Sequence, residues 1–176
     1  MEAVWNKFKP IQTLAFLCIL ELCVSPVFAQ DSTDADHSAV LELGAAVERD
    51  LKGNSSNFGA TLAIEMTPVE NWLELEFGVT ALGTTGHAEL ATDLLFKKPY
   101  RISQTVEFMF GVGLEMVRKF SVEERGTSFA GEVVLDFMFW PTNNIGWYLE
   151  PDYGFVPGKG AEQSLGMTVG LLIGWE

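Results

Sequence analysis

Residues 132–140 read EVVLDFMFW, nine residues that alternate between two kinds of side chain. The segment is too short to cross a membrane as a helix, which requires about 20 apolar residues. Carboxylates at Glu132 and Asp136 fall on one parity of the segment. Apolar groups occupy the other parity: Val133, Leu135, Phe137 and Phe139. Because successive side chains of a strand point to opposite faces, the segment predicts a β-strand with one apolar and one acidic face.

The same two-residue period returns seven more times after Ala39. The segments that carry it are 41–47, 61–66, 73–79, 90–96, 108–114, 147–155 and 165–175. Residues typical of turns, such as Pro, Asn and Gly, lie between many of these segments. The sequence therefore predicts an all-β fold of eight antiparallel strands in up-and-down order.

The links between the predicted strands differ in length. The second, fourth and sixth links are compact and turn-like: 68–71, 97–100 and 141–144. The first, fifth and seventh are longer and more polar: 50–57, 119–128 and 157–164. The third link, 83–87, is shorter than this alternation would give. Short turns at one end and longer loops at the other are typical of outer-membrane barrels.

This alternation also predicts the orientation of the chain. The longer loops are expected to face the cell exterior, at Gly53, Glu124 and Lys159. The short turns are expected to face the periplasm, at Asn71, Pro99 and Thr142. Both ends of the mature chain are then periplasmic.

Two kinds of eight-stranded barrel fit this pattern, and they differ in which face is inside. A secreted lipocalin-like barrel turns its apolar parity inward around a ligand, whereas a membrane barrel turns that parity outward to lipid. Aromatic side chains gather at a membrane–water interface. Five of them fall at strand ends on one predicted rim: Trp72, Tyr100, Trp140, Trp147 and Trp175. A transmembrane β-barrel is therefore the favoured prediction, and the lipocalin-like barrel is the alternative.

The first 29 residues have the pattern of a cleaved secretory signal peptide. Lys7 and Lys9 precede the apolar run 14–20, and small residues of Val27-Phe28-Ala29 stand where a signal peptidase cuts. A membrane anchor over 11–28 is the alternative, although Glu21 and Pro26 interrupt it. Residues 30–38 are predicted to be a flexible acidic segment, and residues 39–176 the barrel domain.

The composition of the exported part limits its partners. Both cysteines, Cys18 and Cys23, lie in the signal, so no disulfide is expected after cleavage. The whole chain has 11 basic and 24 acidic residues, and removing two of each with the signal leaves 9 against 22. Such an acidic chain repels phosphate backbones, which excludes nucleic acid as an expected partner.

The eight alternating strands and the terminal segment G-L-L-I-G-W, residues 170–175, resemble the small outer-membrane β-barrels of Gram-negative bacteria. This class includes OmpA-like and opacity-type barrels, and the resemblance covers residues 39–176. It implies an outer-membrane location, lipid as a partner, and recognition of the C-terminal strand by the barrel assembly machinery. Two features depart from the pattern: Glu176 follows the terminal aromatic residue, and Pro151 interrupts the seventh strand, where a bulge is expected.

The inward parity of the predicted strands is acidic. It carries Glu42, Glu65, Glu74, Glu76, Asp93, Glu107, Glu115, Glu132, Asp136, Glu150 and Asp152. Lys97 is the one basic residue assigned to this parity within a strand, since the other nearby bases belong to the external end: Arg49, Arg118, Lys119 and Arg125. Confined carboxylates are expected to protonate, admit water or hold cations, because an unpaired charge in a low-dielectric space is costly. Glu107, Glu132 and Asp136 are placed at mid-strand and are expected to matter most.

Two functions follow from this lumen. The first is a narrow cation-preferring conduit or an ion-binding barrel, which the excess of acid over base favours. The second is a structural or surface-interaction barrel whose lumen is plugged by its own side chains, which the narrow interior of eight strands favours.

Catalytic signals are weak, and the chain is predicted not to be an enzyme. His37 and His87 are the two histidines, and they fall at opposite ends of the predicted barrel, so they cannot share a metal. A pair of His87 with Ser128 or Ser164 near the external rim would suit a lipid-modifying enzyme, but no triad motif accompanies it. No cofactor and no metal site are predicted.

Overall fold

The computed structural model describes residues 37–53, 55–84, 87–121, 125–157 and 161–175. The predicted signal peptide, most of the acidic segment that follows it, and the predicted loop positions Glu124 and Lys159 lie outside these ranges.

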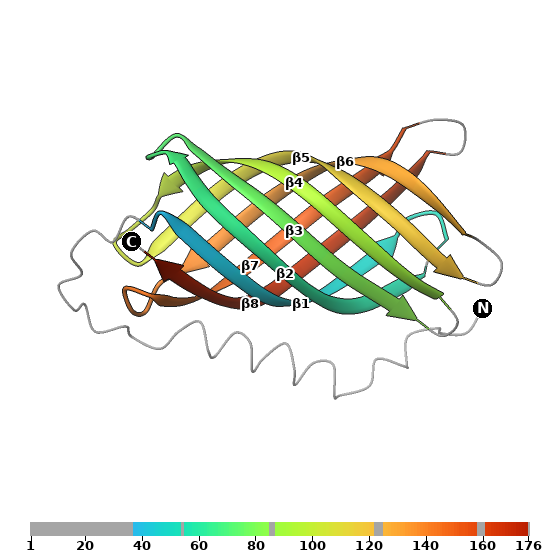
Figure 1. Ribbon diagram of the computed structural model, residues 1–176, viewed down its shortest axis with the longest axis horizontal. Helices are drawn as coiled ribbons and strands as arrows, with labels where there is room; N and C mark the ends of the chain where they lie inside the picture. The colour runs from blue at the N-terminus through green and yellow to red at the C-terminus, as the bar shows by residue number, and fades with distance from the viewer. Residues whose placement is uncertain (1–36, 54, 85–86, 122–124, 158–160, 176) are drawn as a thin grey trace, which may run out of the picture. The chain divides into compact units, whose positions relative to one another are not determined.

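The described residues form a closed barrel of eight strands in sequence order (Figure 1). The strands are β1 (Ala39–Asp50), β2 (Ser56–Val69), β3 (Leu73–Thr84), β4 (His87–Arg101), β5 (Val106–Ser121), β6 (Arg125–Phe139), β7 (Ile145–Val156) and β8 (Glu162–Trp175). Each strand pairs antiparallel with the next, and β8 pairs with β1, where Ala39 lies opposite Trp175. The predicted all-β, up-and-down, eight-stranded barrel is confirmed. None of the described residues forms a helix that is long and apolar enough to cross a membrane.

The two ends of the barrel differ in the chain segments that they hold. The terminal end holds the start of β1, the end of β8 and the connections 70–72, 102–105 and 140–144. The loop end holds the connections 51–55 and 157–161 and the two that join β3 to β4 and β5 to β6.

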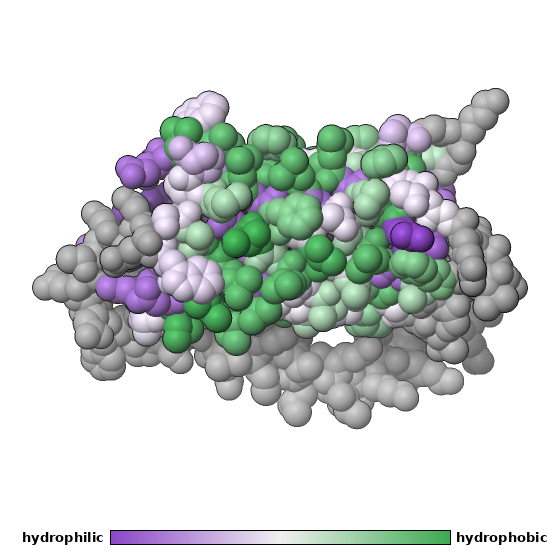
Figure 2. All heavy atoms as spheres, in the orientation of Figure 1, coloured by the Kyte–Doolittle hydropathy of each residue, from purple (hydrophilic) through white to green (hydrophobic). Residues whose placement is uncertain are grey.

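The outer face of the barrel is apolar along its middle. Leu114 and Phe129 have exposed fractions of 69% and 68%, and large apolar residues of every strand are similarly exposed. Figure 2 shows hydrophobic side chains covering the middle of the face in view, with hydrophilic residues toward the ends. Such a continuous apolar surface is far larger than the patches of a soluble monomer. The apolar parity therefore points outward, which is the reverse of a lipocalin-like barrel.

Small inward residues make room for larger ones inside the barrel. Gly44 of β1 and Gly170 of β8 lie opposite each other, and Tyr148 of β7 lies opposite Gly170. A methyl group added at Gly44 would come within 2.5 Å of the Tyr148 hydroxyl oxygen, and one at Gly170 within 2.6 Å of the Tyr148 ring. The two glycines thus form the space that the Tyr148 ring fills.

The predicted alternation of short and long links is wrong. Residues 97–100, predicted as the fourth turn, belong to β4, and the turn follows at 102–105. The predicted long link 119–128 is mostly strand, because β5 continues to Ser121 and β6 begins at Arg125. Lys97, Lys98 and Pro99 resemble turn residues in the sequence. In the barrel they continue β4, because Lys97 faces the acidic interior and strand residues beyond the apolar band face water.

The expected bulge at Pro151 is also wrong. Val134 pairs with Asp152 on one side of the proline and Phe137 with Leu149 on the other, so the register between β6 and β7 is unchanged. Pairing with β6 lapses between these two points, while Pro151 stays paired with Met167 of β8. A proline lacks only one donor, and losing one ladder bond does not require an extra residue. The register shift lies elsewhere, between Met66 and Val69 of β2.

Candidate functional site

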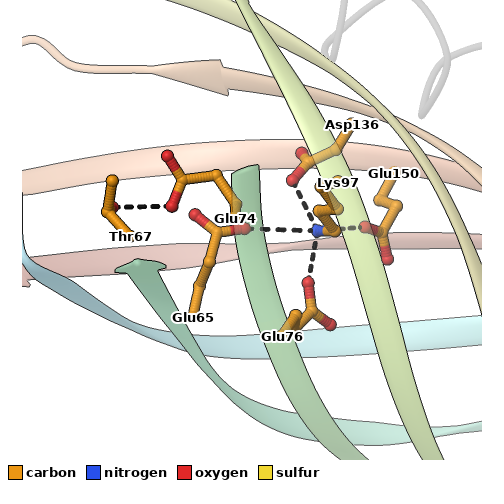
Figure 3. A network of polar contacts seen from close by, with 7 residues as sticks. All are labelled: Glu65, Thr67, Glu74, Glu76, Lys97, Asp136 and Glu150. Carbon is orange, nitrogen blue, oxygen red and sulfur yellow. Dashed lines mark hydrogen bonds and ion pairs between the residues drawn. The ribbon is translucent and has the colours of Figure 1, made fainter. Parts of the chain in front are cut away.

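Lys97 lies at the centre of a group of carboxylates inside the barrel. Its exposed fraction is 1%, and its ammonium contacts Asp136 Oδ2 at 2.9 Å, Glu150 Oε2 at 2.8 Å and Glu76 Oε2, with Glu65 Oε2 at 3.6 Å (Figure 3). Lys97 with these four acids is called the Lys97 cluster below. Its members come from β2, β3, β4, β6 and β7, so the cluster ties together strands from around the barrel.

Cross-strand register explains part of this convergence. Glu65 and Glu76 lie directly opposite each other on β2 and β3, which is an unfavourable placement for two like charges without a counterion. Lys97 is one strand further on, opposite Glu74, whose carboxylate accepts a hydrogen bond of 2.6 Å from the Thr67 hydroxyl. The Lys97 ammonium therefore serves as the counterion for acids that the strand register brings together.

An apolar group closes the lumen between the Lys97 cluster and the terminal end. It comprises Val40, Met109, Met138, Tyr148 and Leu172, with Trp140 packed against it. His37 stacks on Trp140 with ring centroids 4.2 Å apart, and its Nε2 donates a 2.5 Å hydrogen bond to the carbonyl oxygen of Asn143. Among the described residues, this apolar plug leaves no wide passage at that end. The cavity there measures about 40 Å³.

The loop end is open among the residues that the structure describes. A cavity of about 360 Å³, called the vestibule below, is lined by acidic residues that include Glu48, Asp50, Glu89, Glu115 and Glu162. Lys119 also lines it and pairs with Glu162 at 3.3 Å. Deeper in the barrel, a cavity of about 50 Å³ is lined by seven acids: Glu48, Glu76, Asp93, Glu115, Glu132, Glu150 and Asp152. The described residues thus form an acidic recess that opens at one end of the barrel.

All eleven predicted lumen carboxylates occupy inward positions of the barrel. Six are buried: Glu42, Glu65, Glu74, Glu76, Asp136 and Glu150. Five are half-buried: Asp93, Glu107, Glu115, Glu132 and Asp152. Glu107 is not at mid-strand as expected, because it is the second residue of β5, opposite Arg101 at the terminal end.

Lys97 is not the one inward base either. Lys119 of β5 lines the vestibule, and Arg101 of β4 lines the cavity at the terminal end. The inward position of Tyr148 was not predicted from the sequence. Two features indicated it: Tyr148 shares the parity of Glu150, and β8, which pairs with β7, is rich in glycine.

The five predicted interface aromatics all lie near the terminal end, but not all on the outer face. Trp72, Tyr100 and Trp175 are exposed, and Trp147 stacks on Phe139 with centroids 3.9 Å apart. Trp140 has the inward parity of β6 and packs on the apolar plug, so it is part of the closure of the lumen.

The residues that could bind a metal or take part in catalysis are spread over both ends of the barrel and its interior. His37 lies at the terminal end, whereas His87 begins β4 at the loop end, as predicted. Ser128 and Ser164 line the vestibule. Among the described residues, Glu42, Glu65 and Asp136 form a group whose ligand oxygens all lie within 4.8 Å of one another, which is close enough to share one cation.

Comparison with known proteins shows a shared fold. No protein-family model and no curated protein matches the chain. Neisserial surface protein A (NspA) matches with a TM-score of 0.68 at 11% identity, over 78% of this chain and 97% of NspA. The outer membrane protein OprG from Pseudomonas aeruginosa matches with a TM-score of 0.62 at 10% identity, over 82% of this chain and all of OprG. The chain therefore has the architecture of the small eight-stranded outer-membrane barrels.

An enzyme is also among the matching structures. The outer membrane enzyme PagL has a TM-score of 0.50 at 10% identity, over 76% of this chain and 99% of PagL. This fold therefore hosts catalysis in some proteins, and the expectation that the present chain is not an enzyme stays a prediction.

Proposed function

We propose that the protein is an integral outer-membrane barrel that binds cations in a lumen open at one end. The observation that carries the proposal is the acidic recess, in which the vestibule leads to a cavity lined by seven carboxylates. Beyond it, the Lys97 cluster and the apolar plug lie across the lumen. This arrangement favours an ion-binding barrel over a conduit.

The membrane location is supported by two independent features. The outer face is apolar on every strand, and burying an apolar surface of this extent in lipid is strongly favourable. The fold is also that of outer-membrane proteins such as OprG. We place the terminal end in the periplasm on the resemblance of the C-terminal strand to outer-membrane barrels, since the link lengths do not support an orientation. The vestibule then opens to the cell exterior.

The attraction for cations follows from the charges around the deeper cavity. Of the seven acids in its lining, Glu76 and Glu150 are paired with Lys97, and the other five lie outside the Lys97 cluster: Glu48, Asp93, Glu115, Glu132 and Asp152. Confined charges of one sign raise the local concentration of counterions. Mono- or divalent cations are therefore expected to accumulate there, and anions to be excluded.

Two measurements on the purified barrel test the proposal. Planar-bilayer recordings under a salt gradient are expected to show no steady conductance, and equilibrium dialysis is expected to show cation uptake at neutral pH. Glu132→Gln, which removes a charge from the deeper cavity, is expected to reduce uptake. Glu70→Gln is the matched control, because Glu70 is exposed in the turn at the terminal end and should leave uptake in the deep cavity unchanged.

A structural barrel without ligands is the second candidate. The apolar plug and the ion pairs of Lys97 favour it, since they fill the lumen with the protein's own side chains. Absence of both conductance and cation uptake at neutral pH would make this candidate the better account.

A further inference from the structure

Glu42 is a buried carboxylate beside the Lys97 cluster. Its exposed fraction is 1%, and its Oε1 is buried without a hydrogen-bond partner. It comes from β1, and its ligand oxygen lies within 4.8 Å of those of Glu65 and Asp136. A buried carboxylate oxygen without a partner is costly, so this position calls for a donor or a cation.

The Lys97 ammonium cannot satisfy the unpartnered oxygens of Glu42, Glu65 and Asp136. It has three N–H donors, and its nearest carboxylates are those of Glu76, Asp136 and Glu150. Glu65 is left at 3.6 Å, which is beyond ordinary hydrogen-bonding distance. Asp136 gives Oδ2 to the ammonium, while its Oδ1 is buried without a hydrogen-bond partner.

Tyr148 adds a neutral oxygen to the same region. Its side chain is buried, and its hydroxyl has no hydrogen-bond partner. The hydroxyl oxygen lies 2.5 Å from the point where a Cβ on Gly44 would stand, and Gly44 is the next inward residue of β1 after Glu42. The hydroxyl therefore points at the inner face of β1 at Gly44, one inward position from Glu42. This unsatisfied group is independent of the acidic cluster.

We propose that Glu42, Glu65 and Asp136 bind one hard divalent cation, with the Tyr148 hydroxyl beside it, in a site adjacent to the Lys97 ammonium. Carboxylate and hydroxyl oxygens are the ligands of Ca²⁺ and Mg²⁺, and Ca²⁺ tolerates the irregular geometry of groups from four strands better than Mg²⁺. Asp136 would then serve both cations, since its Oδ2 accepts a hydrogen bond from the ammonium and its Oδ1 is buried without a partner. The site rests on the proposed function for the path by which a cation reaches it. Glu76 and Glu150 line the deeper cavity and also belong to the Lys97 cluster, so the cavity adjoins the site.

The charge balance agrees with a divalent ion. Glu42 and the four acids of the Lys97 cluster are five carboxylates against one ammonium among the described residues. A divalent ion halves the remaining excess of four negative charges when all five are ionised. A single monovalent cation would leave most of it.

Calorimetric titration of the intact barrel with CaCl₂ tests the site. The protein is folded in a zwitterionic detergent, which binds no cations of its own, and is stripped with a chelator first. The wild type is expected to show one tight site per chain, above a weaker uptake by the deeper cavity. Glu42→Gln and Asp136→Asn are expected to weaken the tight component roughly tenfold or more, because affinity at such sites follows the number of charged ligands.

Glu132→Gln is the matched control, since it removes one inward carboxylate outside the proposed set. It is expected to reduce the weak uptake and to leave the tight component within about threefold of the wild type, as its charge acts only from a distance. Tight binding that survives Glu42→Gln, or weak uptake without a tight component, would overturn the site and leave the proposed function standing. A tight component without weak uptake would support the site and contradict the cation accumulation proposed for the deeper cavity. No binding of any kind would overturn both.

Because the Gln and Asn variants can alter folding, Tb³⁺ gives a second readout on the wild type. Tb³⁺ replaces Ca²⁺ at oxygen ligands and emits when a neighbouring tyrosine is excited. Emission that CaCl₂ displaces, and that Tyr148→Phe lowers severalfold, is expected. Emission unchanged in Tyr148→Phe would place the ion elsewhere.

Discussion

Replacement of Lys97 by methionine is the most direct test of how the interior is held together. The substitution keeps a side chain of similar length and removes the ammonium that contacts Glu76, Asp136 and Glu150. Removing one partner of a buried ion pair costs about 3–5 kcal/mol, because the other charge is left uncompensated. Since Lys97 serves several carboxylates at once, the loss for Lys97→Met is expected at the upper end of that range, about 4–5 kcal/mol.

Lys98→Met is the matched control in the neighbouring residue. Lys98 points to the outer rim, where its ammonium hydrogen-bonds the Asn71 carbonyl oxygen at 2.5 Å and lies 5.7 Å from the centroid of the Tyr100 ring. Partly exposed contacts of this kind contribute only about 0–1 kcal/mol. Urea unfolding of both variants in lipid vesicles, followed by tryptophan fluorescence, gives the two free energies of unfolding.

The pH dependence separates a charge effect from a packing effect. In Lys97→Met the carboxylates of the cluster lose their counterion, so the folded state favours their neutral form. Acidification supplies that form, and the stability deficit relative to the wild type is therefore expected to be largest at neutral pH and to shrink as the pH falls. Glu76→Gln in the Lys97→Met background is expected to recover part of the loss. Equal stability of Lys97→Met and Lys98→Met, or a deficit that grows on acidification, would refute the role given to Lys97.

Three further outcomes are expected. For orientation, a thiol reagent that cannot cross the outer membrane should label Gly53→Cys but not Thr142→Cys in intact cells, and the reverse result would invert the barrel. For the lipid face, Leu114→Arg should lower stability in lipid by about 2–4 kcal/mol while Glu115→Arg, which faces the acidic vestibule, is tolerated; equal losses would argue against a membrane barrel. For assembly, Trp175→Ala should slow insertion in cells and leave spontaneous folding into vesicles almost unchanged, and equal slowing in both assays would remove the terminal strand's role as a recognition signal.

The faces of the strands could be predicted because alternation is a local property. Glu132 and Asp136 must share a face with Val134 wherever β6 lies, and the structure places all three inward. Strand ends are different, because they depend on where the neighbouring strand stops pairing. Arg101 pairs with Glu107 across β4 and β5, and nothing in the local sequence of either residue indicates that partner.

Pro151 shows the same limit of prediction from local sequence. Its missing donor was correctly expected to weaken a ladder, but whether that produces a bulge depends on both neighbours. Pairing with β8 continues through Pro151, and pairing with β6 resumes in the original register. A bulge needs an extra residue on one strand, and neither β6 nor β7 supplies one here.

The Lys97 cluster lay beyond sequence reasoning because it depends on the stagger of strands around the barrel. Opposed residues on adjacent strands, such as Glu74 and Lys97, follow from register alone. The contacts that hold the ammonium reach instead to Asp136 and Glu150, on strands two and three further round. Closing a sheet of eight strands requires tilted strands with a fixed total stagger, and this stagger decides which inward residues share a height. A count of inward charges can therefore predict that the lumen is acidic, whereas only the closed barrel brings Glu42 next to Asp136, whose Oδ2 already accepts a hydrogen bond from the Lys97 ammonium.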